Sequence, residues 1–384
     1  MIFKKNTLRL LCLILLIPSA AFALGKKTPP LSNNYKVMTF NIGNKGIGKA
    51  PEQEWVGRFG AVIRAIKANK PDFIGTQEGN HAQLKSLDRG FHHKGDNNGF
   101  SFIELWKKSK MKLNDQYKWI GQGDASGAII KRSGKYNAIY YKKNRFDVLE
   151  KGNLWYSVTG LQKNSTLARV EQKIAEVTLN LGTQKLPNWT KVEIDFSQFE
   201  TRMFSWGKFR DKGTGKEMFI FNTQIYKDKT KETTNDMSVL AAKIFAVNLL
   251  RDYIFKKAHK NNQMTPVFVT GNYHTSYMNL PVSGVLSWPH GNYFLKNDYF
   301  YLNQVRVLGI PTGFLPDSSE TLHQFGTIKG RFGSPQYPED WTLSAGDNLH
   351  RKSSTIDKKK YKNIWGDLVW PSNHHPVTTV YTID

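Results

Sequence analysis

The sequence predicts one large α+β domain with a sheet-rich core and helices outside it. Strand-like and helix-like segments alternate from Tyr35 to the last residues, and no internal repeat or linker-like stretch interrupts residues 35–384. The composition supports a large core, because 39% of the residues are hydrophobic and the chain holds 23 Phe, 16 Tyr and 10 Trp. The same numbers exclude wholesale disorder.

The start of the chain differs from the rest. A basic N-terminus is followed by an apolar run over residues 8–18 and by the small-residue pattern Ala21-Phe22-Ala23. This arrangement is typical of a secretory signal peptide over residues 1–23, and residues 24–34 are expected to form a short tether. An uncleaved membrane anchor is the alternative, but the apolar run is shorter than the ~20 residues that cross a bilayer. We therefore expect an exported protein, periplasmic or secreted.

The chain is strongly basic. It has 55 Lys and Arg against 31 Asp and Glu, a formal charge of +24, which loss of the leader with Lys4, Lys5 and Arg9 would lower to +21. Such a charge favours a polyanionic partner, whether nucleic acid, a phospholipid head group or a small phosphoester. A simply basic surface is the alternative. The only cysteine, Cys12, lies in the leader, so the mature chain must rely on its core without disulfides.

The opening unit is a strand, a helix and a second strand. Residues 36–41 are predicted to form a buried strand, and residues 54–68 a helix that Pro71 brings to an end. Residues 73–76 then form a strand that leads into Gln77-Glu78. The apolar side chains at helical spacing on one face of the helix are Trp55, Phe59, Val62, Ile63 and Ile66.

The later elements continue the alternation. Residues 138–141 and 146–149 are expected to be a strand pair, and residues 203–209 and 217–222 a hairpin around the turn at 211–215. The remaining predictions are a helix over 237–258, a strand over 266–270 and a C-terminal strand over 377–383.

Polar residues at the strand ends form an ordered series of motifs. Five segments are, in chain order, Thr39-Phe40-Asn41, Gln77-Glu78, Asn222-Thr223-Gln224, Thr270-Gly271-Asn272-Tyr273-His274 and Ser372-Asn373-His374-His375-Pro376-Val377. They resemble the signature of the endonuclease/exonuclease/phosphatase superfamily, whose usual forms are a strand-end Asn, Gln-Glu, Asn-Thr-His, Gly-Asp-x-Asn and Ser-Asp-His. Framework segments match as well, at 136–143, Arg202, Gly326-Thr327 and 339–344. The resemblance covers roughly residues 36–382.

The resemblance implies a fold and a chemistry. The fold is a four-layer α/β/β/α sandwich, with two mixed β-sheets packed face to face and helices outside. The chemistry is phosphoester hydrolysis, in which Mg²⁺ or another divalent cation polarises a phosphoester oxygen while acid and base groups act on opposite sides of the phosphorus. Substrates of the superfamily include DNA, RNA, inositol phosphates, sphingomyelin and small phosphoesters. We expect a monomer.

The resemblance also assigns roles to residues. Glu78, Asn41 and Asp340 would hold the metal, and Asn41, Arg202 and Tyr136 would contact the substrate. The positions that correspond to catalytic groups are His374, Asn272, Gln224, His274, Asn373 and Arg202.

Four of these positions depart from the usual motifs. Gln224 replaces a His, Asn272 an Asp, His274 an Asn and Asn373 an Asp. An amide neither accepts a proton near neutral pH nor adds negative charge to a metal site, so Asn272 cannot serve as the base. Asn373 is expected to leave His374 without a carboxylate partner. The losses favour a weakened or inactive site that binds a phosphorylated or anionic ligand, over an active enzyme with a variant site.

Further alternatives concern metals and loops. A zinc site from His274, His374 and His375 is conceivable, although adjacent strand residues point to opposite faces. Two stretches, 79–115 and 158–200, are longer than the minimal form, and the second holds a turn-like passage at 181–189 between two plausible strands. These insertions either determine which substrate or partner binds, or they are surface segments without such a role. The basic run at 350–362 either grips phosphates or is solvated surface.

Overall fold

The computed structural model describes residues 32–45, 53–90, 111–125, 134–157, 174–180, 189–226, 236–261, 263–274, 301–302, 340–346 and 348–384. Residues Asn33–Asp384 form one compact unit. The predicted signal peptide and the framework dipeptide Gly326-Thr327 lie outside the described residues. Within the described part of the chain, no helix is both long and apolar enough to cross a membrane.

The first sheet has its strands in the order β15-β18-β1-β2-β4-β3. They are β1 (Asn34–Asn41), β2 (Phe73–Gln77), β3 (Tyr117–Ile120), β4 (Ala138–Lys142), β15 (Leu349–Ile356) and β18 (Val377–Ile383). β1 is parallel to β2 and antiparallel to β18, so the first and last strands of this sheet are neighbours. The strands predicted over 36–41, 73–76 and 377–383 are confirmed. From Met38 onward β1 is buried without interruption, as expected for a strand covered on both faces.

The second sheet has the order β13-β14-β12-β9-β8-β5. Its strands are β5 (Phe146–Trp155), β8 (Met203–Asp211), β9 (Glu217–Gln224), β12 (Val267–Asn272), β13 (Tyr301–Leu302) and β14 (Asp340–Ala345). The predicted hairpin is confirmed as β8 and β9. The expected pairing of 138–141 with 146–149 is wrong, because β4 pairs with β2 and β3 in the first sheet whereas β5 pairs with β8 in the second.

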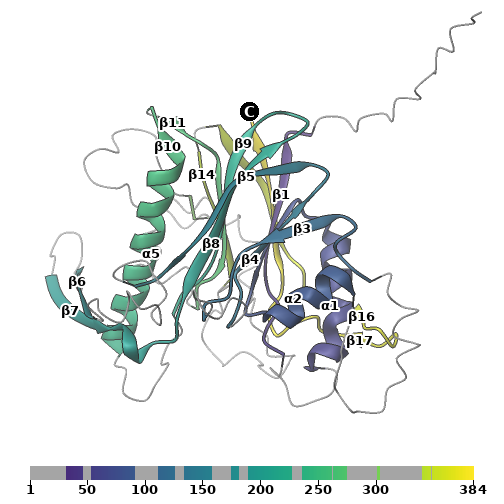
Figure 1. Cartoon of the computed structure of the whole chain (residues 1–384), viewed down its shortest axis with the longest axis horizontal. Coiled ribbons are helices and arrows are strands. Elements are labelled where there is room, and N and C mark those ends of the chain that lie inside the picture. Colours follow the sequence, from purple (N-terminus) through teal and green to yellow (C-terminus); the bar gives the residue numbers. More distant parts are fainter. Residues whose placement is uncertain are drawn as a thin grey trace, which may run out of the picture. The chain divides into compact units, whose positions relative to one another are not determined.

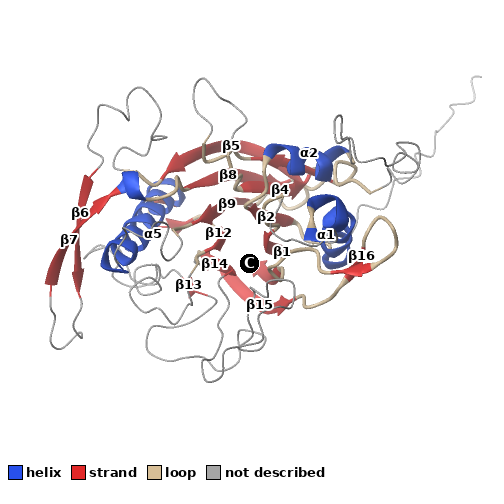
Figure 2. Cartoon of the chain, turned by 90° about the horizontal axis from the view of Figure 1, so that it is seen from below, coloured by secondary structure: helices blue, strands red, loops and turns tan. Residues whose placement is uncertain are grey.

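The two sheets pack face to face between helices, which confirms the four-layer sandwich (Figures 1 and 2). Apolar side chains from both sheets fill the space between them, among them Val37, Phe73, Tyr141, Phe209 and Phe268. A second buried cluster joins the first sheet to the helices α1 (Trp55–Asn69) and α2 (His81–Arg89). A third joins the second sheet to α5 (Asp236–Ala258).

The helices follow local sequence rules. The five apolar residues predicted to share one face of α1 are all buried, and Lys70, in the left-handed conformation at φ 49°, caps the helix before Pro71. α2 begins with a capping box in which the Asn80 side chain accepts from the Gln83 backbone N–H and the Gln83 side chain accepts from the Asn80 N–H. Sequence reasoning missed α2, although this Asn-x-x-Gln spacing was visible.

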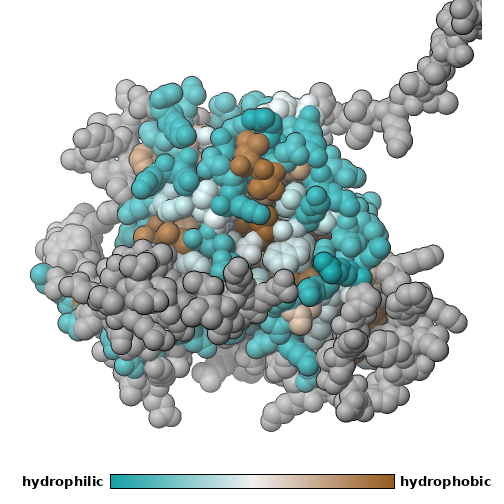
Figure 3. Space-filling view, in the orientation of Figure 1, coloured by the Kyte–Doolittle hydropathy of each residue, from teal (hydrophilic) through white to brown (hydrophobic). Residues whose placement is uncertain are grey.

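Shorter elements complete the described chain. They are β6 (Ile174–Asn180), β7 (Trp189–Asp195), β10 (His259–Lys260), β11 (Gln263–Met264), β16 (Tyr361–Lys362), β17 (Leu368–Val369) and the 3-10 turn Phe196–Gln198. β6 and β7 pair antiparallel, so the two strands expected around 181–189 are confirmed. On the face shown in Figure 3 the described side chains are mostly hydrophilic, with small apolar patches.

Candidate active site

Motif residues from both sheets collect at one end of the sandwich. In the second sheet, Gln224, Asn272 and Asp340 are direct cross-strand partners on β9, β12 and β14. In the first sheet, Asn41 and Gln77 are partners at the ends of the parallel strands β1 and β2. The carboxyl ends of parallel strands meet at one edge of a sheet, which is where open α/β folds place ligands.

A buried histidine and carboxylate form the centre of the site. The Nδ1 atom of His374 lies 2.7 Å from Oδ2 of Asp340, and both side chains are buried. The expectation that His374 lacks a carboxylate partner is therefore wrong. The Oδ1 atom of Asn373, the residue before His374, instead lies 3.2 Å from the Ser372 hydroxyl oxygen. Asp340 thus orients the imidazole, and its expected role as a metal ligand stays a prediction.

The other imidazole nitrogen faces an amide. Because the carboxylate can only accept, Nδ1 of His374 carries the proton and Nε2 is left to accept from Nδ2 of Asn41 at 3.3 Å. Oδ1 of Asn41 accepts from the Gly43 backbone N–H at 2.9 Å, which fixes the direction of this amide. The Ser372 hydroxyl donates to the Asn41 carbonyl at 2.7 Å and ties the two motifs together.

Gln224 is the hub of the second half of the site. Its Oε1 accepts from Arg202 at 3.2 Å, and since a guanidinium only donates, the amide NH₂ must point the other way. That NH₂ lies 2.8 Å from Oε1 of Glu78 and 2.9 Å from Nε2 of His274. One neutral amide therefore donates both to the predicted metal-binding carboxylate and to the histidine that replaces the motif Asn.

The backbone around this hub is strained. Glu78 has φ 64° and His274 has φ 45°, the left-handed region that residues with a Cβ seldom adopt. The Asn272 side chain accepts from the His274 N–H at 3.0 Å, and the buried Lys243 on α5 donates to the His274 carbonyl at 2.8 Å. These contacts hold His274 in the turn that presents it to Gln224.

Of the three predicted substrate contacts, Asn41 lies beside His374, whereas Arg202 and Tyr136 contact other residues. Arg202 is buried and forms an ion pair with Glu200 at 2.5 Å, and Asp124 lies 3.9 Å away. The ring of Tyr136 belongs to the outer cluster of the first sheet, where it lies 6.0 Å from the Trp119 ring. The structure thus places Arg202 beside Gln224, and Tyr136 in the apolar layer under α2.

Each expected metal ligand already accepts a hydrogen bond from a protein donor. Mg²⁺ is held by one or two carboxylates and further oxygen ligands. Of the three expected ligands, Glu78 accepts from Gln224, Asn41 from Gly43 and Asp340 from His374. The part of the chain that the structure describes contains no group of three or more His, Cys, Asp or Glu residues that could hold a metal ion.

The three-histidine alternative finds no support in the same geometry. His274 and His374 face Gln224 and Asp340, and His375 packs edge-on against the Trp370 ring at 5.2 Å. Burial, together with the nearby Lys358, lowers the pKa of His375 to about 4, so this side chain is neutral at pH 7.

Motif amides also join the two sheets behind the site. Nε2 of Gln77 on β2 donates to Oδ1 of Asn222 on β9 at 2.7 Å, and the Thr270 hydroxyl donates to the same oxygen at 3.0 Å. Gly75 permits this approach, because a Cβ there would lie 1.8 Å from the Thr270 hydroxyl. These two amides therefore hold the sheets in register and stand behind the reactive groups.

Arg58 is a positioning residue that sequence reasoning missed. It is fully buried, and its guanidinium donates to the carbonyls of Gln53, Ile42, Gly43, Asn44 and Pro371. It thereby fixes the loop after Asn41 against the segment before His374. Its position in the sequence could have indicated this burial. Arg58 lies three residues after Trp55 and four before Val62, on the apolar face of α1, where a charged side chain needs a buried partner.

Comparisons with known proteins identify the fold. No protein-family model matches the sequence, and no curated protein matches it at a significant level. Among solved structures, an endonuclease/exonuclease/phosphatase from Bacteroides vulgatus matches 91% of this chain and 99% of its own, at 18% identity and a TM-score of 0.58. A mannosyl-6-phosphatase from Bacteroides thetaiotaomicron matches 90% of this chain and 98% of its own, at 17% identity and a TM-score of 0.56. D. rerio TDP2 with a single-strand DNA product matches 91% and 99%, at 10% identity and a TM-score of 0.52.

Proposed function

The chain has the fold of the endonuclease/exonuclease/phosphatase superfamily, and on this premise we propose that it is an exported phosphoester-binding protein with a reduced hydrolytic site. The histidine–carboxylate half of the site is retained, and the metal half is replaced by neutral donors. A phosphorylated or anionic ligand would bind at this end of the sandwich with little or no turnover.

The position of the Gln224 amide carries the proposal. Its NH₂ donates to Glu78 at 2.8 Å. The motifs assign two carboxylates to the metal, and because Asp340 is paired with His374, Glu78 is the one left to bind a cation. Asn272 and Asn373 add no negative charge nearby, so a cation gains little by displacing the amide. Electrostatic stabilisation of the phosphoryl group by a metal, usually a large part of such catalysis, would then be weak.

Neutral and cationic donors would bind the ligand instead. Nδ2 of Asn41 and Nε2 of His374 lie 3.3 Å apart in the free site. When His374 is protonated, both nitrogens carry N–H groups that could donate to one bound anion. Asp340 stabilises the imidazolium that such binding requires, because its carboxylate accepts from Nδ1. The formal charge, +24 for the whole chain and +21 after the proposed loss of the leader, would raise the local concentration of anions.

The intact His374–Asp340 pair favours a second candidate, an active phosphodiesterase or phosphatase with a variant site. A carboxylate that orients a histidine through Nδ1 makes Nε2 the nitrogen that can exchange a proton with a reacting oxygen. In that case His374 would act as the acid or base, and Glu78 would have to release the Gln224 amide to take up a cation.

A hydrolysis and binding panel separates the two candidates. The purified protein is assayed on plasmid DNA, RNA, sphingomyelin and a chromogenic phosphodiester, with Mg²⁺ or with EDTA. Binding of inorganic phosphate is measured by calorimetry. We expect hydrolysis near background, and phosphate binding that His374→Gln abolishes and Glu78→Gln leaves unchanged. Robust Mg²⁺-dependent turnover that Glu78→Gln removes would establish the second candidate instead.

Export is tested separately. The basic start, the apolar run and Ala21-Phe22-Ala23 predict cleavage after Ala23, so the protein recovered from the envelope or the medium should begin at Leu24. N-terminal sequencing checks this, and an intact Met1 on the exported protein would contradict it.

A further inference from the structure

Exposed basic and apolar side chains meet on one hairpin beside α1. The segment 358–370, called here the lysine hairpin, contains β16 and β17 and lies next to α1 in Figure 1. Its exposed basic side chains are Lys358, Lys359, Lys360 and Lys362. Trp365 is 45% exposed and Leu368 is 63% exposed, and only Leu149 joins them as a large exposed apolar side chain among the described residues.

The lysine hairpin is firmly attached to the domain. Ile364 is buried in the outer cluster of the first sheet, and a Cβ at Gly60 on α1 would lie 3.0 Å from it, so the helix and hairpin touch closely. Arg64 donates to the Asn363 carbonyl at 2.8 Å. At the start of the hairpin, Asp357 accepts from the Tyr361 hydroxyl at 2.5 Å.

The turn of the lysine hairpin is also fixed. Oδ1 of Asn363 accepts from the backbone N–H groups of Trp365 and Asp367, each at 2.9 Å. Gly366 follows Trp365 with φ 105°, and a Cβ there would meet nothing within 4 Å, which places the turn in open solvent. The exposed apolar side chains are therefore carried by an ordered turn.

We propose that the lysine hairpin docks the protein on an anionic phospholipid surface. The four lysines would lie over the lipid phosphates, while Trp365 and Leu368 enter the head-group region, where indole rings and aliphatic chains are favoured. Asp367 is the exposed carboxylate in the hairpin, and its Oδ2 accepts from Nδ2 of Asn363 at 3.2 Å. Charge complementarity thus points to an anionic partner.

The apolar pair distinguishes a membrane from a nucleic acid. Lysines alone would suit either polyanion, and a tryptophan could stack on a base. Leu368 has no aromatic face to stack on a base, yet it is the most exposed of the large apolar side chains described. Burial of Leu368 in lipid accounts for that exposure.

The proposed docking does not depend on the activity of the candidate site, although the lysine hairpin and the site are adjacent in the chain. β17 leads through Trp370 and Pro371 directly into the Ser372–His374 motif, and Arg58 donates to the Pro371 carbonyl at 3.2 Å. Docking would bring that motif close to lipid head groups.

Vesicle co-sedimentation of the purified protein tests the proposal. Vesicles of phosphatidylcholine are compared with vesicles that also contain phosphatidylglycerol, across a salt series, with a DNA duplex as a parallel ligand. We expect binding only to the anionic vesicles, weakened by salt. Lys359→Gln with Lys362→Gln should weaken it about 25-fold, near fivefold for each lysine, and Leu368→Ser should weaken it about tenfold.

A matched variant controls for general loss of charge and apolar surface. Leu149→Ser with Lys151→Gln makes the same kinds of change on β5 and should leave vesicle binding unchanged, with thermal melts to verify that every variant is folded. Equal binding of wild type and Leu368→Ser, or hairpin-dependent binding to DNA without binding to vesicles, would overturn the proposal.

Discussion

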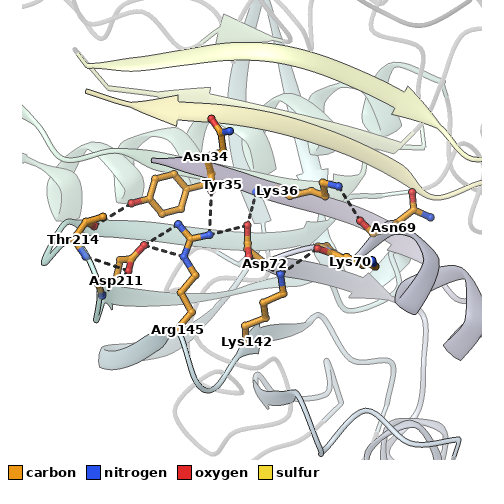
Figure 4. A network of polar contacts seen from close by, with 12 residues as sticks. Asn34, Tyr35, Lys36, Asn69, Lys70, Asp72, Lys142, Arg145, Asp211 and Thr214 are labelled. Carbon is orange, nitrogen blue, oxygen red and sulfur yellow. Dashed lines mark hydrogen bonds and ion pairs between the residues drawn. The ribbon is translucent and has the colours of Figure 1, made fainter. Parts of the chain in front are cut away.

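The two ends of the sheet sandwich are held by different kinds of polar contact. At the end where β1 begins, Arg145 lies between two buried carboxylates, 3.2 Å from Asp72 and 2.9 Å from Asp211. Lys142 adds a second cation at 2.8 Å from Asp72, and Figure 4 shows how these groups converge from several strands. The two buried carboxylates at this end, Asp72 and Asp211, each have a cation beside them.

At the end where β1 finishes, amides supply many of the polar contacts, next to the ion pair of Arg202 with Glu200. Asn41, Gln224 and Asn272 supply many of the contacts, and the carboxylates of Glu78 and Asp340 accept from an amide and an imidazole. The buried carboxylates Asp72 and Asp211 are thus compensated by cations. At the motif end, Glu78 and Asp340 instead accept from an amide and an imidazole, and Gln224 and Asn272 carry no charge, which lowers the cost of burying them.

The largest effect should come from breaking the charged end. Arg145→Met would leave Asp72 and Asp211 buried with one fewer cation, and we expect a loss of about 3 kcal/mol in the free energy of unfolding. Urea denaturation at pH 7 measures it. Arg210→Gln, which removes the exposed pair with Glu217, is the control and should cost less than about 1 kcal/mol. Equal losses for both variants would show that the buried ion pairs of Arg145 stabilise the fold no more than an exposed pair does.

The next effect should come from restoring charge at the motif end. Gln224→His, Asn272→Asp, His274→Asn and Asn373→Asp together free Glu78 from the amide and return two carboxylates. Mg²⁺-dependent hydrolysis of a chromogenic phosphodiester should rise at least about 100-fold. Each single change should do little, because the groups act as one unit.

The control for this prediction is the same fourfold change in a His374→Ala chain, which should stay at background. Turnover by the wild-type protein equal to that of the fourfold variant would contradict the reduced-site proposal.

The smallest effect concerns pH. Burial and Lys358 lower the pKa of His375 to about 4, whereas the unfolded chain binds that proton near 6.5. Between pH 6.5 and 4 the unfolded state binds a proton that the folded state does not. The stability that neutral His375 contributes is therefore fully present above pH 6.5 and is lost as the pH falls to 4. We expect a decrease of about 1–3 kcal/mol, measured by urea denaturation across this range.

His375→Phe keeps a ring against Trp370 and should flatten that pH dependence. His350, which is exposed on β15 and lies 2.8 Å from Asp384, provides the control, because His350→Gln should retain the slope of the wild type. An unchanged slope in His375→Phe would show that another group causes the loss.

The elements that sequence patterns predicted well are the strongly periodic ones. The helix at 54–68 and the strands at 36–41 and 377–383 each carry an uninterrupted apolar pattern, and the structure confirms them. The expected pairing of 138–141 with 146–149 is wrong, because the short polar stretch between them does not reveal that the next strand joins the other sheet.

The site was predictable in its members but not in its pairings. Motif order identified His374 and Asp340, yet the carboxylate partner was sought next to His374 in the sequence. Neighbouring residues in extended chain point to opposite sides, so the partner comes from β14, a strand 34 residues earlier in the chain. The contact between Gln224 and Glu78 depends on how two sheets face each other, which local patterns do not encode.

The pairing of β1 with β18 has a consequence for synthesis. Asn34 is opposite Thr382, so β1 gains its second neighbour only after synthesis has reached β18. Until then the growing chain cannot close this sheet, and pairing across such a long sequence separation is slow. For a chain that is exported as proposed, this delay keeps the polypeptide unfolded, in the state that can thread through a translocation channel.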